Sequence, residues 1–308
     1  MKSVYVIGSL AFTCAAYGFL SYYISKKKVK VAEKDELLEL LQTLDDSRVK
    51  KEVLLNVLNK LIELSAFTII KVRIHDLSYL HKIAKLLNHC DEEVQLAAAL
   101  LINNLSNNER NQSILKEYIP TLVHILKNTK MNNKTVTLHI AVLNSLTNLT
   151  TLEENHEFIV VHINTFCEIL QKCKILQIKI QILRVLVNCS SNTKISENML
   201  EVDVQMLGSV ERFVHPDEDE RCLLRAVHCC ANVLSSLHRR WQYGKRLSIA
   251  STEFVSQRLR QNLLKLTLHT NEDIRLQAAR SLRSLREPIC IESNASIDDI
   301  DLIEVLKI

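Results

Sequence analysis

The chain is poor in the two residues that punctuate tight turns, since its 308 residues include only four glycines and three prolines. Average proteins contain about 7% glycine and about 5% proline. A sheet with many tight turns needs these residues, whereas helices joined by short connections tolerate their scarcity. The composition therefore predicts an all-α protein.

Motifs that mark common enzymes and metal sites are also missing. The sequence has no Walker A or GxGxxG loop, no HExxH motif and no GxSxG motif. Its nine cysteines form no CxxC pair and its eleven histidines are scattered, which disfavours a metal centre. The net charge of +4 gives no nucleic-acid signal by itself. We predict a protein that is not an enzyme and uses no cofactor, metal or nucleic acid.

What the sequence does contain is an apolar stripe with helical spacing that recurs six times. Within the stretch Asp91–Ser106 the stripe consists of Val94, Ala98, Ile102 and Leu105. The last stripe positions of the six copies are Leu64, Leu105, Leu149, Cys189, Val233 and Leu285, at steps of 41, 44, 40, 44 and 52 residues. Further amphipathic segments precede the copies, which suggests three helices per unit. The pattern predicts an armadillo-like, right-handed superhelical solenoid of about six repeats.

We place the repeat domain at residues 35–288, with an insertion at 237–255 that accounts for the long last step. The insertion carries basic and aromatic side chains that could touch lipid headgroups or a partner: Arg239, Arg240, Trp241, Tyr243, Lys245 and Arg246. Ser248 follows Lys-Arg-Leu, which resembles a basophilic kinase site. An ordinary solvated loop is the alternative. Residues 289–308 are predicted to form an acidic and apolar tail or cap.

Residues 4–24 form an apolar run without a charge. At about 1.5 Å per residue, this run spans roughly 31 Å, about one hydrocarbon thickness. Four lysines follow at positions 26–30, and the positive-inside rule then places the C-terminal body in the cytosol. We predict a transmembrane signal anchor at residues 1–25 and a basic linker at 26–34. A cleaved secretory signal and a buried helix are the alternatives.

The residue before the last stripe position is asparagine in four consecutive copies: Asn104, Asn148, Asn188 and Asn232. This position lies beside the buried stripe, where solenoids present their concave face, and a carboxamide can pair with the backbone of an extended peptide. One helical turn earlier, Arg184 and His228 could favour an acidic partner. The alternatives are that the asparagines cap or bridge adjacent repeats and that the charged residues form a solvated face.

The segments LKEYIPTLVHIL, LNSLTNLTTLEENHEFIVVHINTFCEIL and KIQILRVLVNCSSNTKISENMLEVDVQM resemble the armadillo-repeat-containing Alex family and its autosomal relatives. The resemblance covers about residues 36–290, and the N-terminal apolar segment is similar to that family's anchor. It implies a single-pass mitochondrial outer-membrane protein whose repeats face the cytosol. It also implies a role in mitochondrial distribution through Miro GTPases and Trak kinesin adaptors, without catalytic residues.

These observations together predict a membrane-anchored armadillo adaptor that binds partner proteins through its concave groove. The alternative is a soluble or endoplasmic-reticulum-anchored protein-binding regulator with no mitochondrial role.

Overall fold

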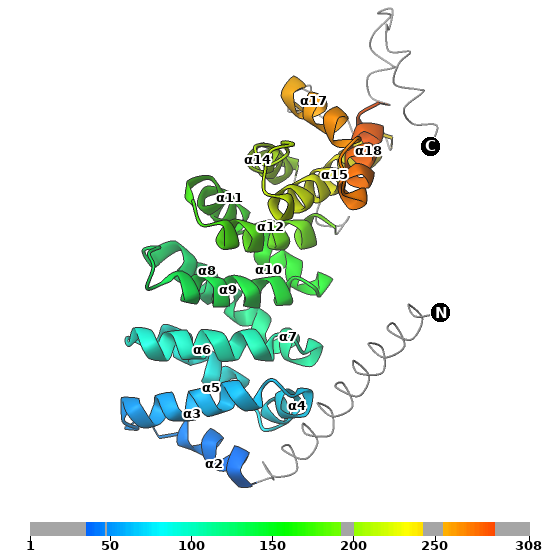
Figure 1. Ribbon diagram of the computed structural model, residues 1–308. Coiled ribbons are helices and arrows are strands. Elements are labelled where there is room, and N and C mark those ends of the chain that lie inside the picture. Colours follow the sequence, from blue (N-terminus) through cyan, green and yellow to red (C-terminus); the bar gives the residue numbers. More distant parts are fainter. Residues whose placement is uncertain (1–34, 47, 192–199, 243–254, 287–308) are drawn as a thin grey trace, which may run out of the picture. The chain divides into compact units, whose positions relative to one another are not determined.

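The computed structural model describes residues 35–46, 48–191, 200–242 and 255–286. Within these ranges the regular structure consists of α-helices and short 3-10 helices, without a strand (Figure 1). The predicted all-α class is therefore confirmed. The chain divides into two compact units, Met1–Phe158 and Ile159–Ile308.

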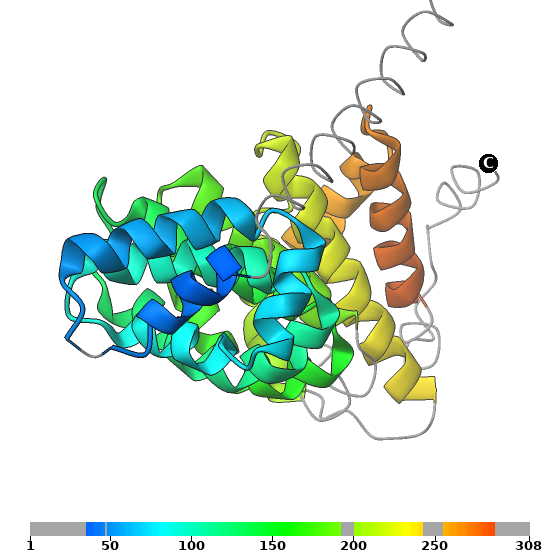
Figure 2. The same cartoon turned by 90° about the horizontal axis from the view of Figure 1, so that it is seen from below.

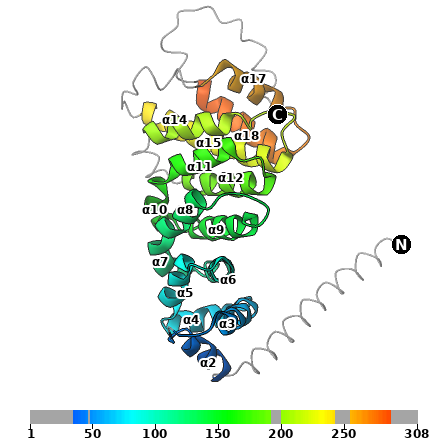
Figure 3. The same ribbon diagram turned by 90° about the vertical axis from the view of Figure 1, so that its left-hand side faces the viewer.

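The first unit, which we call unit 1, holds two terminal helices, α2 (Asp35–Thr43) and α3 (Lys51–Leu64), followed by two complete three-helix repeats. Its other helices are α4 (Thr68–Asp76), α5 (Leu80–Lys85), η1 (Leu86–Asn88), α6 (Glu92–Leu105), α7 (Glu109–Leu115), η2 (Lys116–Tyr118), α8 (Ile119–Asn128), α9 (Val136–Leu149) and η3 (Glu153–Asn155). The third helices α3, α6 and α9 pack side by side, and α4, α5, α7 and α8 form the layer behind them (Figure 3). The short helix α10 (His156–Val160) spans the boundary between the units.

In the second unit, unit 2, the described helices come in pairs, and we call the second helix of each pair a third helix because it carries the stripe. Its helices are α11 (Ile163–Lys172), α12 (Leu176–Ser190), α14 (Leu200–Glu211), α15 (Glu220–Gln242), α17 (Gln257–Leu266) and α18 (Glu272–Arg286). The third helix α15 packs against both α12 and α18, while α11 packs against α14. All six predicted stripe copies therefore lie on third helices: α3, α6, α9, α12, α15 and α18.

The structure differs from the sequence prediction at the start of the insertion. Residues 237–242 continue α15 rather than begin a loop. The physical reason is that Leu237 lies four residues after the buried Val233, and no glycine or proline interrupts the helix before Gly244. The rest of the predicted insertion, except for its last residue, lies outside the described residues.

The predicted stripe is the side that each third helix buries. In α6, Val94, Ala98, Ile102 and Leu105 are all fully buried. The exceptions are in α3, where Val53 is 45% exposed and Leu64 is half-buried. In the described part of the chain only the short helix α2 precedes α3, and α2 lies at the end of unit 1 that faces the viewer in Figure 2. The burial of a stripe residue therefore depends on the helices that pack beside it as well as on its position in the stripe.

Polar side chains at the repeat junctions cap the N-termini of third helices. Asp91 accepts hydrogen bonds from the backbone N–H groups of Glu93 at 3.0 Å and Val94 at 3.2 Å at the start of α6. Asn271 does the same for Asp273 at 3.0 Å and for Ile274 at 3.3 Å at the start of α18. These bonds satisfy donors that a helix N-terminus leaves unpaired.

Within the described residues, no helix combines the length and apolarity required to cross a bilayer. Three predicted segments lie outside those residues: the anchor at 1–25, the linker at 26–34 and the tail at 289–308. All three assignments stay predictions.

Candidate protein-binding site

Four third helices carry the asparagine row, which we define as Asn104 and Asn148 in unit 1 and Asn188 and Asn232 in unit 2. Asn104, Asn148 and Asn188 lie near the C-terminal ends of α6, α9 and α12, whereas Asn232 lies in the middle of the longer helix α15. Asn104, Asn148 and Asn188 are half-buried, and Asn232 is buried. The row therefore borders the core without being fully enclosed by it.

In unit 1 the asparagine row joins consecutive repeats. The Nδ2 group of Asn148 donates to the backbone oxygen of Asn103 at 3.2 Å and to Ser106 Oγ at 3.0 Å. Asn104 repeats this arrangement, because its Nδ2 donates to the backbone oxygen of Ile62 at 3.2 Å and to Ser65 Oγ at 3.0 Å. Carbonyls in the last turn of a helix lack partners within that helix. The asparagines thus satisfy the C-terminal end of the preceding third helix.

Unit 2 contains the same bridge with an added partner. Asn232 donates through Nδ2 to Ser190 Oγ at 3.1 Å, and its Oδ1 accepts from Arg280 Nη1 at 2.9 Å. Both ends of this carboxamide are therefore engaged. By contrast, no described residue donates a hydrogen bond to the Oδ1 atom of Asn104 or Asn148. Those two oxygens can accept a hydrogen bond from a partner's backbone N–H.

The bridging alternative for the asparagines is thus what the structure shows for Asn104, Asn148 and Asn232. Partner binding by the row stays a prediction, and for unit 1 the two roles are compatible because they use different atoms. The sequence contained a usable signal for the bridge. A serine or threonine stands two positions after three members of the row, at Ser106, Thr150 and Ser190, and Ser65 stands at the same place in the first copy, where Glu63 replaces the asparagine.

The two charged residues singled out in the sequence both lie on the third helices of unit 2. Arg184 is exposed on α12, where its Nη1 donates to Gln181 Oε1 at 3.0 Å. His228 is half-buried on α15, and burial together with the nearby Arg280 charge lowers the pKa of its imidazole. Burial and the charge of Arg184 likewise lower the pKa of Arg225. The structure therefore adds Arg225 and Arg280, which the sequence reading missed.

Only part of the predicted lipid or partner loop can be placed. Arg239 is exposed on α15, and its Nε donates to the backbone oxygen of Ser235 at 3.3 Å. Arg240 and Trp241 belong to the last turn of α15. The remaining predicted residues, Tyr243, Lys245, Arg246 and the phosphorylation candidate Ser248, lie outside the described residues. Their roles stay predictions.

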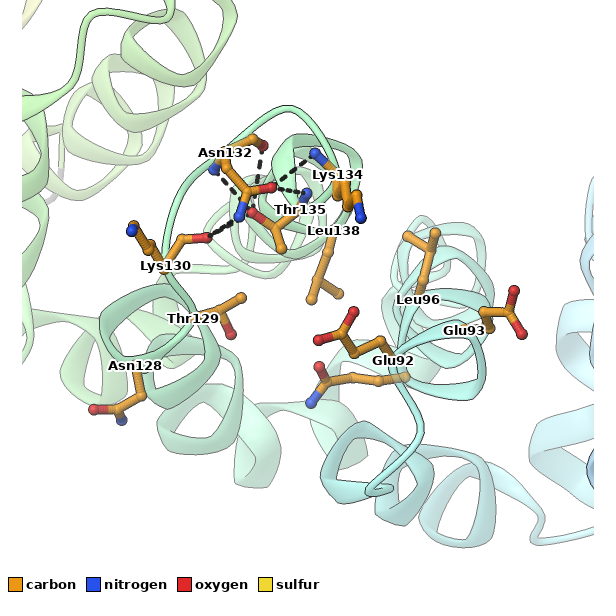
Figure 4. Close-up of a pocket in the computed structure, with 11 residues that line it drawn as sticks. Glu92, Glu93, Leu96, Asn128, Thr129, Lys130, Asn132, Lys134, Thr135 and Leu138 are labelled. Atoms are coloured by element: carbon orange, nitrogen blue, oxygen red, sulfur yellow. Dashed lines mark hydrogen bonds between the residues drawn. The ribbon is translucent and has the colours of Figure 1, made fainter.

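A recess of about 420 Å³ in unit 1 was not foreseen from the sequence. It lies between the start of α6, the end of α8 and the connection from α8 to α9, and Glu92 and Leu138 point into it (Figure 4). Asn132 shapes the connection, because its Oδ1 accepts from the backbone N–H groups of Lys134 at 2.8 Å and Thr135 at 3.2 Å. This loop geometry has no periodic signature in the sequence.

The recess is separate from the asparagine row. Its lining residue Leu96 stands eight residues before Asn104, which is about 12 Å along the axis of α6. Glu92 and Glu93 bring negative charges, and Lys130 and Lys134 bring positive ones. The recess therefore favours no single class of ligand by charge. In the described part of the chain, no group of three or more histidine, cysteine or acidic side chains is placed to hold a metal ion.

Repeated three-helix units joined by a row of bridging asparagines define the chain as an armadillo-repeat protein, a fold typical of non-enzymatic binding scaffolds. A family model described as Armadillo-like matches residues 29–283. The chain belongs to this Armadillo-like family.

Solved structures of designed armadillo repeat proteins have the same fold. One such protein matches with a TM-score of 0.67 and 17% identity, over 81% of this chain and 99% of its own. A second, solved in complex with the peptide (KR)4, matches with a TM-score of 0.66 and 18% identity, over 82% of this chain and 100% of its own. Proteins computationally designed for modular peptide recognition match with a TM-score of 0.65 and 17% identity, over 80% of this chain and 99% of that chain.

Proposed function

We propose that the chain is a membrane-anchored adaptor that binds partner proteins as extended segments along its third helices. The observation that carries this proposal is the pair of Oδ1 atoms of Asn104 and Asn148. They occupy equivalent positions on the adjacent helices α6 and α9. In each asparagine the Nδ2 atom of the same carboxamide donates a hydrogen bond to the preceding third helix. The bridges thereby fix the orientation of the two acceptors before a partner arrives.

The spacing of these acceptors suits an extended peptide. Packed helices lie about 8–10 Å apart, and an extended chain advances about 3.3 Å per residue. One asparagine then meets about every third residue of a partner. Since a hydrogen bond contributes about 0.5–1.5 kcal/mol net, the asparagines supply a modest share of the affinity. Neighbouring side chains must supply the specificity. The designed relative with a bound (KR)4 peptide supports peptide binding by this fold.

The proposed location is the mitochondrial outer membrane, with residues 4–24 as a single-pass anchor and the repeats in the cytosol. Support comes from the uncharged apolar run, the lysines that follow it and the resemblance to the Alex family. On the same resemblance we propose a role in mitochondrial distribution, with Miro GTPases and Trak kinesin adaptors as partners. The competing location is the endoplasmic reticulum membrane, and the competing function is that of a soluble regulator.

Binding can be tested without touching the bridges between repeats. Leu100 and Asn144 are half-buried one helical turn before Asn104 and Asn148. In a Leu100→Glu, Asn144→Glu variant, we expect recovery of crosslinked partners from mitochondria to fall several-fold while the melting temperature stays within a few degrees. Leu268→Glu is the matched control, because Leu268 is 79% exposed and lies outside every third helix. Equal losses in both variants would contradict binding at the third helices.

The anchor is tested with a full-length chain that carries a C-terminal tag. We expect the chain to stay with mitochondrial membranes after alkaline extraction and the tag to be digested by protease added outside intact mitochondria. A chain lacking residues 4–24 should be released into the soluble fraction. A tag that resists external protease until the outer membrane is opened would show that the proposed orientation is wrong.

A further inference from the structure

The position one helical turn before the asparagine row changes character between the two units. In unit 1 the corresponding residues are uncharged: Asn59, Leu100 and Asn144. In unit 2 they are Arg184 on α12, His228 on α15 and Arg280 on α18. Arg225 also lies on α15, about one helical turn before His228. We call Arg184, Arg225 and Arg280 the arginine cluster.

Contacts within unit 2 hold the arginine cluster on neighbouring helices. α15 packs against both α12 and α18, so the three arginines come from one continuous set of third helices. Arg280 Nη1 donates to Asn232 Oδ1 at 2.9 Å, which ties its guanidinium to the adjacent repeat. Arg225 Nη1 donates to the backbone oxygen of Arg221 at 2.7 Å. These bonds use only part of each guanidinium, which has five N–H donors.

No described carboxylate forms an ion pair with any member of the cluster. The ion pairs of unit 2 within the described ranges are Lys172–Glu168, His215–Asp217 and Arg221–Asp219. The positive charges of the cluster are therefore not neutralised by the described residues. Burial is the main cause of the lowered pKa of Arg225, and the charge of Arg184 adds to it, so these two guanidinium groups lie close enough to repel each other. A bound anion would relieve this repulsion.

We propose that unit 2 recognises an acidic extended segment of a partner protein, whose carboxylates meet Arg184, Arg225 and Arg280. This inference rests on the proposed function and gives the partner a chemical class. A guanidinium can bind a carboxylate through two parallel hydrogen bonds, which gives both affinity and orientation. At about 8–10 Å between helices, acidic residues at about every third position of the segment would face successive repeats.

The surroundings of the cluster favour a short acidic peptide over a polyanion. Asp273 lies close enough to raise the pKa of His228, opposing the larger effects of burial and Arg280. The charge of Asp219, the residue before α15, likewise raises the pKa of Arg225 against the larger effects of burial and Arg184. These carboxylates border the cluster and would repel the long, uniform charge of nucleic acid or an anionic membrane.

The test uses the full-length chain in detergent and a fluorescent peptide with glutamate at every third position and serine and glycine between. The matched probe has glutamine in place of each glutamate. We expect fluorescence anisotropy to show binding of the glutamate peptide, at least about tenfold weaker binding of the glutamine peptide, and weakening as salt is added. Arg184→Gln with Arg280→Gln should weaken binding of the glutamate peptide about tenfold or more.

Two further variants separate recognition from folding. Arg184→Glu reverses one charge without touching the bond between Arg280 and Asn232, and it should also abolish most binding. Arg110→Gln changes an exposed arginine on α7 of unit 1 and should leave binding unchanged. Equal binding of both peptides, or unchanged binding by Arg184→Glu, would overturn the inference. So would tighter binding of single-stranded DNA or of phosphatidylserine incorporated in the detergent micelles. If only this test fails, while Leu100→Glu with Asn144→Glu still loses partners, the adaptor function stands and only the acidic class is wrong.

Discussion

Asn148 on α9 donates a 3.0 Å hydrogen bond to Ser106, the residue directly after α6, and so ties one repeat to the repeat before it. Ser106 in turn donates through Oγ to the backbone oxygen of Asn103 at 2.8 Å. The amide, the hydroxyl and the carbonyl thus form a closed set at the end of α6. The same set joins Asn104 to Ser65, and Asn232 to Ser190. Adjacent third helices are therefore held in a fixed register by polar contacts as well as by the buried stripe.

Removing one of these bridges is expected to destabilise the fold. We predict that Asn148→Ala lowers the free energy of unfolding by about 1–2 kcal/mol, because the hydrogen bonds to Asn103 and Ser106 are lost at a partly buried site. Asn148→Asp should cost more, since a carboxylate oxygen would then face the Asn103 carbonyl. Urea unfolding followed by circular dichroism measures both. Asn56→Ala, at an exposed position on α3, is the control, and equal stability of all three variants would refute the bridge.

The pKa of His228 should respond to the loss of a neighbouring charge. Burial lowers this pKa below the usual 6.5, and the positive charge of Arg280 lowers it further. We therefore expect Arg280→Met to raise the pKa of His228, as measured by NMR titration of the imidazole. Arg110→Gln should leave it unchanged. A pKa that stayed the same in Arg280→Met would mean that burial alone sets it.

The lowered pKa of His228 also has a consequence for stability. As the pH falls through 6.5, the unfolded chain takes up a proton before the folded chain does. The contribution of this residue is fully present above pH 6.5 and is lost as the pH falls toward the folded-state pKa. His228→Gln is expected to flatten the dependence of the urea midpoint on pH in that range. An unchanged slope would show that the shift is absent.

Asp91 should contribute to the pH dependence of stability in a more acidic range than His228 does. Its hydrogen bond with Lys51, at 2.7 Å, is the main reason that its pKa lies below 3.8, and the N–H groups of Val94 and Glu93 add to the effect. This contribution is present above pH 3.8 and disappears as the pH falls through the lower, folded-state pKa. Asp91→Asn keeps a capping oxygen but removes the charge. We expect it to lose less stability than the wild type on acidification, as measured by thermal melts across the range.

Cysteine reactivity should follow burial. Cys90 is exposed, whereas Cys189, Cys222 and Cys230 are buried in the stripe. Burial raises the pKa of Cys222 to about 11 and raises that of Cys189 further, so their thiolate fractions are small. Brief treatment with iodoacetamide at pH 8 is expected to label Cys90 and to spare the other three, as read by peptide mass spectrometry. All four should react in urea. Early labelling of Cys189 in the native chain would contradict its place in the core.

The sequence was sufficient for the fold because the stripe follows one rule in every copy after the first. Each third helix buries residues at the helical period, so Val94, Ala98 and Ile102 could be assigned to the core without coordinates. Val53 broke the rule because burial also depends on the neighbours of a helix, and α3 begins the array. Periodicity says nothing about what lies beyond the last repeat.

The site was predicted less fully, for a different physical reason. Side-chain hydrogen bonds join atoms that are about 40 residues apart in sequence, such as Asn148 and Ser106, and their direction depends on rotamers. Arg280 was missed although it occupies the same position as Arg184 and His228, because the sixth copy has Ser284 in place of the asparagine. The loop that shapes the recess depends on the turn at Asn132, which leaves no periodic trace.

The bridging carboxamides also limit how recognition can evolve in this protein. In Asn104 and Asn148 the nitrogen holds two repeats together while the oxygen is available to a ligand, so a mutation that alters the second role disturbs the first. New preferences are therefore easier to acquire at the neighbouring positions one turn away, such as Leu100 and Arg184, where exchange leaves the stacking intact. Diversity among related chains should gather at those positions and spare the asparagines.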